Sequence, residues 1–96
     1  MTLGFVVKRK VNEIMMRVLE NPYEIKHLEI IERILRTLKP IHLNLDLWKA
    51  QNIYFSVGKK FYNSVKEKSL TGNVTAQKWV EYFNKLGEHL SVRVVP

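Results

Sequence analysis

Residues 46–69 read DLWKAQNIYFSVGKKFYNSVKEKS, and this stretch decides the fold. It holds no proline, and its large apolar side chains recur at intervals of three, four and seven residues. Trp48, Phe55 and Tyr62 lie seven apart, and the residues directly before each of them repeat that spacing. Such intervals place side chains on one face of an α-helix. We therefore predict a helix over about 47–69 whose broad aromatic face packs into a core.

Three further helices are predicted outward from this one. Apolar residues at steps of three and four indicate a first helix over about 3–19, a second over about 22–39 and a fourth over about 75–89. The residues expected to face inward on these three helices are Val7, Val11, Ile14, Met15, Val18, Leu28, Ile31, Leu35, Leu38, Trp79, Val80, Phe83, Leu86 and Leu90.

Capping residues and prolines set the expected helix boundaries. Asn21 is the expected N-cap of the second helix, with Pro22 in its first turn, and Pro40 stops that helix. Asp46 and Thr75 are the expected N-caps of the third and fourth helices. The short link between the first two helices predicts that they are antiparallel neighbours.

Two segments outside the helices are apolar enough to be ordered. Residues 40–45 are expected to run extended with Ile41, Leu43 and Leu45 as anchors, and the alternating tail 91–95 is expected to be extended or a short β-strand. Ninety-six residues suffice for one hydrophobic core. The predicted fold is therefore an all-α, four-helix bundle-like domain over 1–96 with a short extended or β C-terminal tail.

The composition restricts the class of protein. The absence of cysteine excludes disulfides and thiolate metal sites, and it fits a cytoplasmic protein. No apolar run reaches the roughly 18 residues of a membrane span. The N-terminal apolar stretch precedes its charges, which is the reverse of a secretory signal. We expect a cytoplasmic protein without membrane contact.

The positive charge lies mostly in the second half of the chain. Of the net charge of +7, residues 1–48 supply +2 (eight basic, six acidic) and residues 49–96 supply +5 (eight basic, three acidic). A solvated surface explains this excess, and a nucleic-acid-binding module is an alternative. The aromatic residues are expected on the apolar face, away from the lysines, so nucleic-acid binding is not favoured. The lysines in question are Lys59, Lys60, Lys66, Lys68, Lys78 and Lys85.

No catalytic or metal-binding motif is present. Glycoside hydrolysis needs two carboxylates about 5–9.5 Å apart, but a capping role explains Asp46, and the glutamates fall mostly on predicted polar faces. His27, His42 and His89 are far apart in sequence. No glycine-rich phosphate loop occurs. The sequence predicts no catalytic residue, no metal and no cofactor.

The candidate binding residues are Trp48, Gln51, Asn52 and Tyr54. In this part of the chain two amides lie among large apolar side chains. The structural interpretation is that both amides bond to the backbone of the 40–45 segment, since buried amides need partners. The functional interpretation is a polar patch beside aromatic rings that holds a sugar or a partner surface.

The same run carries a family resemblance. The pattern LWxAQN at 47–52, with LGxxLxVRV at 86–94, resembles the C-terminal helical region of bacterial α-amylase-related proteins of glycoside hydrolase family 57. The similarity covers about residues 40–95, and the first two helices match only in character. The resemblance implies an accessory helical domain of unknown function that follows a distorted (β/α) barrel bearing two catalytic carboxylates.

Several expectations follow from that resemblance. The chain would be the C-terminal fragment of a larger α-glucan-acting hydrolase that needs no cofactor, and a start inside an apolar helix is consistent with this. Its partner would be the catalytic domain of the same parent chain, with an α-glucan as a further ligand. None of the barrel motifs is present, so the resemblance carries over no catalytic residue. The remaining alternative is a helical protein-interaction domain.

Overall fold

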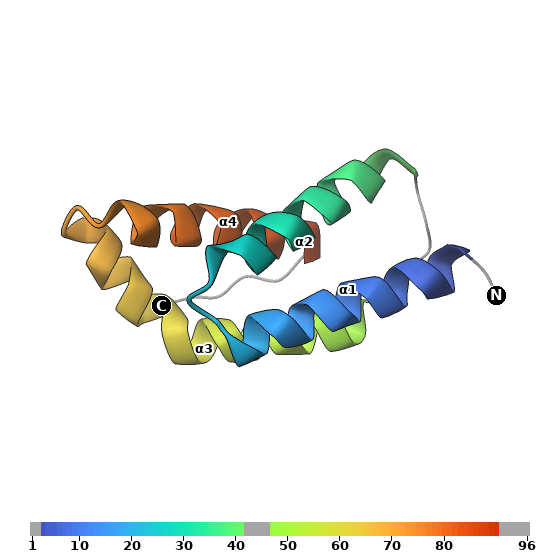
Figure 1. Cartoon of the computed structure of the whole chain (residues 1–96), viewed down its shortest axis with the longest axis horizontal. Helices are drawn as coiled ribbons and strands as arrows, with labels where there is room; N and C mark the ends of the chain where they lie inside the picture. Colours follow the sequence, from blue (N-terminus) through green and yellow to red (C-terminus); the bar gives the residue numbers. More distant parts are fainter. Residues whose placement is uncertain (1–2, 42–46, 91–96) are drawn as a thin grey trace.

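The described residues form an all-α structure, as predicted. The computed structural model describes residues 3–41 and 47–90 (Figure 1). Within them lie four α-helices and one 3-10 turn, and no strand. The elements are α1 (Leu3–Glu20), α2 (Ile25–Leu38), η1 (Lys39–Ile41), α3 (Trp48–Leu70) and α4 (Val74–Leu90).

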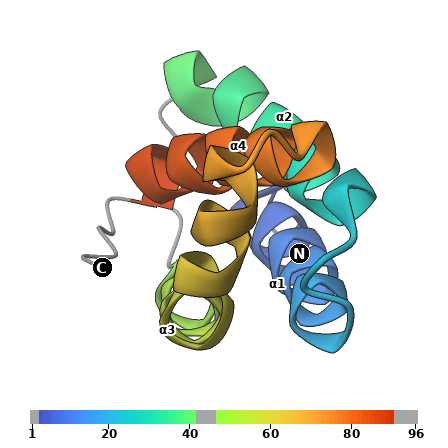
Figure 2. The same cartoon turned by 90° about the vertical axis from the view of Figure 1, so that its left-hand side faces the viewer.

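The four helices pack in a closed ring. α1 contacts α2 and α3, and α4 contacts the same two helices (Figure 2). α1 and α2 run antiparallel, as their short link predicts (Figure 1). α3 is curved: its first half runs beside α1, and its second half turns toward α4 (Figure 1). This ring encloses one core, which explains why each helix carries one apolar face.

On α1 and α4 the core contains nearly every residue that periodicity places in it. All five inward positions predicted for α4 are buried, and so are four of the five predicted for α1. Aromatic rings from α3 and α4 stack at its centre, with ring centroids 4.2 Å apart for Tyr54 and Phe83 and 4.7 Å apart for Trp79 and Phe83. Tyr62 packs against the same two rings of α4. This aromatic stack joins α3 to α4.

The start of α2 differs from the prediction. Asn21 and Pro22 do not begin the helix, which starts at Ile25 without a side-chain cap. The Asn21 carbonyl accepts a hydrogen bond from the Glu24 N–H at 3.0 Å. A four-residue turn with proline in its second position competes with the helix here. The turn also places the Pro22 carbonyl where the Trp79 indole N–H donates to it.

The N-cap of α4 also differs from the prediction. Thr75 does not cap this helix. Asn73 does, because its Oδ1 accepts from the Ala76 N–H at 3.0 Å. The preceding residue is Gly72, with φ of 92°, so residues 71–73 form a turn in a backbone conformation that favours glycine.

We expect Asn73→Ala to lower the free energy of unfolding by about 1 kcal/mol, the usual cost of losing an N-cap. Asn73→Asp keeps a capping oxygen and should change it little. Urea denaturation followed by circular dichroism measures both. Thr75→Ala is the control, and a larger loss for Thr75→Ala than for Asn73→Ala would contradict this assignment.

The remaining boundary predictions are tested only in part. α2 ends at Leu38, and Lys39–Ile41 form a 3-10 turn, so the extended course predicted from residue 40 does not include Pro40 and Ile41. Residues 42–46 and 91–96 lie outside the described residues. The predicted anchors Leu43 and Leu45, the Asp46 cap and the strand-like tail all fall there.

Candidate functional site

The four candidate residues point to opposite sides of α3. Trp48 is 70% exposed and Asn52 is exposed, whereas Tyr54 is buried and Gln51 is half-buried. Each helical residue turns by about 100°, so Tyr54, two positions after Asn52, faces the opposite side of the helix. The LWxAQN motif therefore places Trp48 and Asn52 at the surface, while Ala50 is buried and Leu47 and Gln51 are half-buried.

Gln51 holds the end of α4. Its Nε2 donates to the Leu90 carbonyl at 2.8 Å, 39 residues away in sequence. Leu90 is the last residue of α4, and the final carbonyls of a helix have no partner within it. Gln51 satisfies one of them and ties the first turn of α3 to the C-terminus of α4. The amide has the structural role that the sequence suggested, with a different backbone partner.

Tyr54 has a structural role in the aromatic stack. Its hydroxyl donates to the Phe83 carbonyl at 2.9 Å. Burial raises the pKa of the Tyr54 hydroxyl far above its usual value, and the nearby Tyr62 raises that pKa further. The folded protein therefore holds Tyr54 in its neutral form.

This raised pKa predicts a loss of stability at alkaline pH. An unfolded tyrosine ionises at about pH 10. Below that pH the contribution of Tyr54 to the free energy of unfolding is fully present. It declines as the pH rises further, because only the unfolded state then loses the proton. Tyr54→Phe should cost about 1 kcal/mol at pH 7 through the lost hydrogen bond. The gap between the two proteins should narrow above pH 10 in thermal melts. A gap that widens there would contradict the assignment.

Asn52 lies on the solvent side of α3. Its Nδ2 donates to the Trp48 carbonyl at 2.8 Å, one turn earlier in the same helix. The bond fixes the amide beside the first turn, next to Trp48. The structural interpretation predicted a bond from Asn52 to the backbone of residues 40–45. In the described residues the Asn52 amide instead bonds to Trp48, and residues 42–46 lie outside that part.

The outward-facing residues of α3 form a stripe. We define the α3 stripe as Trp48, Asn52, Phe55 and Lys59, which follow one another at steps of four, three and four. All four are exposed. The Lys59 ammonium lies 5.7 Å from the centroid of the Phe55 ring, within cation–π range. The stripe thus combines two aromatic rings, an amide and a cation on one convex helix face.

The prediction that Trp48 and Phe55 face the core is wrong. Exposure falls from 70% at Trp48 to 49% at Phe55 and 8% at Tyr62. A seven-residue repeat drifts by about 20° per repeat, and α3 also turns from α1 toward α4 along its length (Figure 1). The members of the series therefore meet different surroundings. Only Tyr62, at the end of the series, turns into the core. Sequence spacing gave the periodicity correctly but not which end of the series is buried.

A buried carboxylate lies elsewhere, on α2. Glu32 is 3% exposed, and its Oε2 lies 3.1 Å from the His89 Nε2 and 3.6 Å from the Arg36 Nε. Sequence reasoning placed the glutamates mostly on polar faces. The missed signal is that Glu32 lies four residues after Leu28 and three before Leu35, within the apolar stripe of α2. The described polar partners of Glu32 are basic, so this cluster connects α2 to α4 and is not a pair of catalytic carboxylates.

We expect His89→Ala to lower the free energy of unfolding by about 1–3 kcal/mol, because it removes a hydrogen-bond partner from a buried carboxylate. Arg36→Ala is the matched control, and it should cost less than about 1 kcal/mol because the Arg36 side chain is largely exposed. Chemical denaturation at pH 7 measures both, and the reverse ranking would contradict the role of His89.

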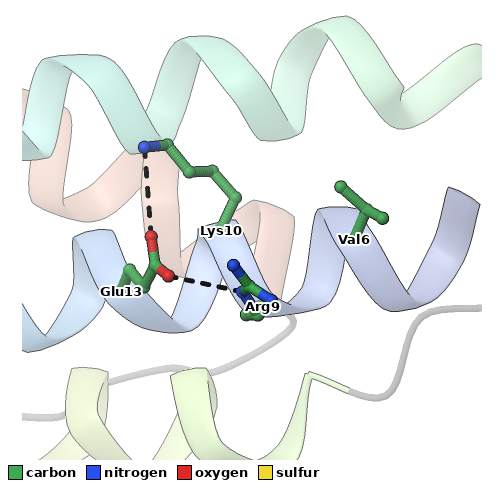
Figure 3. Close-up of a pocket in the computed structure, with 4 residues that line it drawn as sticks. All are labelled: Val6, Arg9, Lys10 and Glu13. Atoms are coloured by element: carbon green, nitrogen blue, oxygen red, sulfur yellow. Dashed lines mark ion pairs between the residues drawn. The ribbon is translucent and has the colours of Figure 1, made fainter. Parts of the chain in front are cut away.

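Two cavities lined by described residues do not provide a ligand site. One, of about 280 Å³, is lined by Val6, Arg9, Lys10 and Glu13 of α1 (Figure 3). Its charged groups satisfy one another, since the Glu13 carboxylate pairs with Arg9 at 3.6 Å and with Lys10 at 4.0 Å.

The second cavity, of about 150 Å³, is smaller than the roughly 300–1,000 Å³ typical of ligand pockets. It lies between the α1–α2 turn and the α3–α4 turn. Its lining residues are Tyr23, Val65, Lys68, Asn73, Thr75, Ala76 and Trp79.

The described residues also show no grouping suited to a metal ion. No cluster of three or more His, Asp or Glu side chains occurs among residues 3–41 and 47–90. In the same residues, no helix combines the length and the apolar character needed to cross a membrane. The surface feature with the clearest binding chemistry is therefore the α3 stripe.

Comparison with known proteins gives no relative. No family model, no curated protein and no solved structure matches this chain. The fold and the α3 stripe define the class that the structure supports, an all-helical domain with an aromatic surface stripe.

Proposed function

We propose that this chain is a non-catalytic accessory domain that docks onto another protein domain through the α3 stripe. Following the motif resemblance, the proposed partner is the catalytic barrel of a family 57 α-amylase-related glycoside hydrolase, within the same parent chain. The observation that carries the proposal is the 70% exposure of Trp48 at the start of α3. Tryptophan is the residue type most often found to dominate binding energy at protein interfaces, together with tyrosine and arginine.

The exposed pair Trp48 and Asn52 also supports an α-glucan as a further ligand. An aromatic ring can cover the apolar face of a sugar, and a neighbouring amide can bond to its hydroxyls. The Asn52 amide is held one helical turn from Trp48 by its bond to the Trp48 carbonyl. The domain would then help to shape the glucan-binding cleft of its partner. The cysteine-free sequence supports a cytoplasmic location.

Nucleic-acid binding is the second candidate, and one observation favours it. Trp48 and Phe55 are exposed on the helix that carries Lys49, Lys59 and Lys60, whereas the sequence suggested that aromatic and basic residues lie on separate faces. Single-strand binders hold the backbone in a basic groove lined with aromatic rings. The α3 stripe is a convex helix face, and this shape suits insertion into a recess of a protein partner.

Titration calorimetry with a purified family 57 catalytic domain tests the proposal. We expect saturable binding by the full chain and no glucan hydrolysis by the chain alone. Leu70→Ala removes another exposed apolar side chain of α3, 75% exposed, and should bind like the unmodified chain. Absence of binding, or hydrolysis of an α-glucan by the isolated chain, would contradict the proposal. Maltoheptaose titration tests the glucan part separately.

A further inference from the structure

Charge is distributed differently on α3 than on the other helices. In the described residues, α1, α2 and α4 each pair a cation with a carboxylate four residues away. These pairs are Arg9–Glu13, Arg33–Glu29, Arg36–Glu32 and Lys85–Glu81. Such pairs neutralise a helix surface locally. Within residues 3–41 and 47–90, no lysine of α3 forms an ion pair.

The sequence of α3 explains this difference. No Asp or Glu occurs from residue 47 to residue 66, whereas Lys49, Lys59 and Lys60 are all exposed. Lys59 belongs to the α3 stripe, and the other two flank it. The Lys59 ammonium lies over the Phe55 ring, so this cation and an aromatic ring share one place on the stripe. Along residues 48–60, α3 thus presents apolar rings beside three exposed lysines, and no carboxylate of the described residues forms an ion pair with them.

We propose that the α3 stripe binds a protein surface in which carboxylates surround an apolar recess. This inference rests on the proposed docking function and specifies its partner. The rings of Trp48 and Phe55 would fill the recess, and the carboxylates would pair with Lys49, Lys59 and Lys60. At about 1.5 Å per residue, the stripe from Trp48 to Lys59 is about 16 Å long. This length suits a helix laid into a groove, with contacts at each turn.

Charge complementarity argues against a two-fold dimer of this chain through the α3 stripe. A two-fold interface would place the same patch on both sides. The lysines of one copy would then face those of the other, and the stripe contains no acidic residue to neutralise them. Like charges facing each other at an interface cost several kcal/mol. The partner therefore carries the opposite charge.

Two matched double variants test the inference. Lys59→Glu with Lys60→Glu reverses charge at the stripe. Lys26→Glu with Lys78→Glu makes the same change in net charge on exposed positions of α2 and α4. The probes are the family 57 catalytic domain and two synthetic amphipathic peptides, one with glutamates flanking a row of leucines and one with glutamines in their place.

The expected result has three parts. The glutamate peptide binds at least tenfold more tightly than the glutamine peptide at low salt, and added salt narrows that difference. The stripe variant loses this preference, and the control variant keeps most of it. The catalytic domain should behave like the glutamate peptide, so it should bind the control variant well and the stripe variant poorly.

Other results would overturn the inference. Equal binding of the two peptides, or equal losses in both double variants, would show that no charge-specific site exists on α3. The catalytic domain could bind the stripe variant normally and fail to bind Trp48→Ala. That result would support the docking function and contradict the inference of an acidic partner surface. Tight binding of oligo(dT) at Trp48, with no response to the glutamate peptide, would assign the stripe to nucleic acid instead.

Discussion

Replacing Trp79 by alanine is expected to lower the free energy of unfolding by about 3–5 kcal/mol, the usual loss for a large buried aromatic residue. Trp79 is 1% exposed and stacks on Phe83 at 4.7 Å. Its indole N–H donates to the Pro22 carbonyl, 57 residues earlier. One side chain thus connects α4 to the α1–α2 turn and to the aromatic stack. Domains of this size have only about 5–15 kcal/mol of stability, so the variant should melt far earlier.

A milder variant separates the two contributions of Trp79. Trp79→Phe keeps a stacking ring but removes the donor to Pro22, so its loss should be clearly smaller than that of Trp79→Ala. Urea denaturation followed by far-ultraviolet circular dichroism measures both. A loss below about 1 kcal/mol for Trp79→Ala would show that the core is not organised around this stack.

The second large effect concerns binding, not stability. Trp48→Ala should change the free energy of unfolding by less than about 0.5 kcal/mol, because an exposed side chain away from the core contributes little. The same variant should weaken docking to the catalytic domain by about 30-fold or more, the threshold of an interface hot spot. Calorimetric titration and urea denaturation of the same preparation give both numbers.

Leu70→Ala serves as the control for Trp48→Ala, because it removes an exposed apolar residue of the same helix outside the α3 stripe. It should leave the dissociation constant unchanged within about twofold. If Trp48→Ala destabilised the fold by several kcal/mol, Trp48 would be a core residue. If both variants bound normally, the stripe would have no part in docking.

Helix positions and most of the core could be predicted from the sequence. Apolar spacing alone placed Val11, Ile14, Met15 and Val18 inside α1, and all four are buried. The spacing of Glu29 and Arg33, four residues apart, suits a pair across one helical turn, and these side chains lie 3.1 Å apart. These features depend on local periodicity, which the sequence records directly.

Other features depend on contacts between distant residues. The partners of Gln51 and Tyr54 lie 39 and 29 residues away, so no local pattern identifies them. The partner of the buried Glu32 carboxylate is His89, which reaches it from another helix. The α4 cap was ambiguous because Asn73 and Thr75 are both suitable caps two residues apart. Only the backbone geometry decides between them.

The candidate site was predicted as a set of residues but not as a surface. The four candidates are close together in sequence, yet two support the core and two face solvent. Phe55 and Lys59 also belong to the stripe, but this depends on the direction in which their side chains point, and the sequence pattern does not give that direction. A heptad-spaced aromatic series is compatible with either a buried or an exposed face along part of its length.

The two tryptophan indole N–H resonances give the most direct test of the docking site. Trp48 lies on the surface and Trp79 in the core, so each reports on its own environment. When the catalytic domain is added to the ¹⁵N-labelled chain, the Trp48 signal should shift or broaden while the Trp79 signal stays in place. Saturating addition that leaves the Trp48 signal unmoved would contradict the role assigned to the α3 stripe.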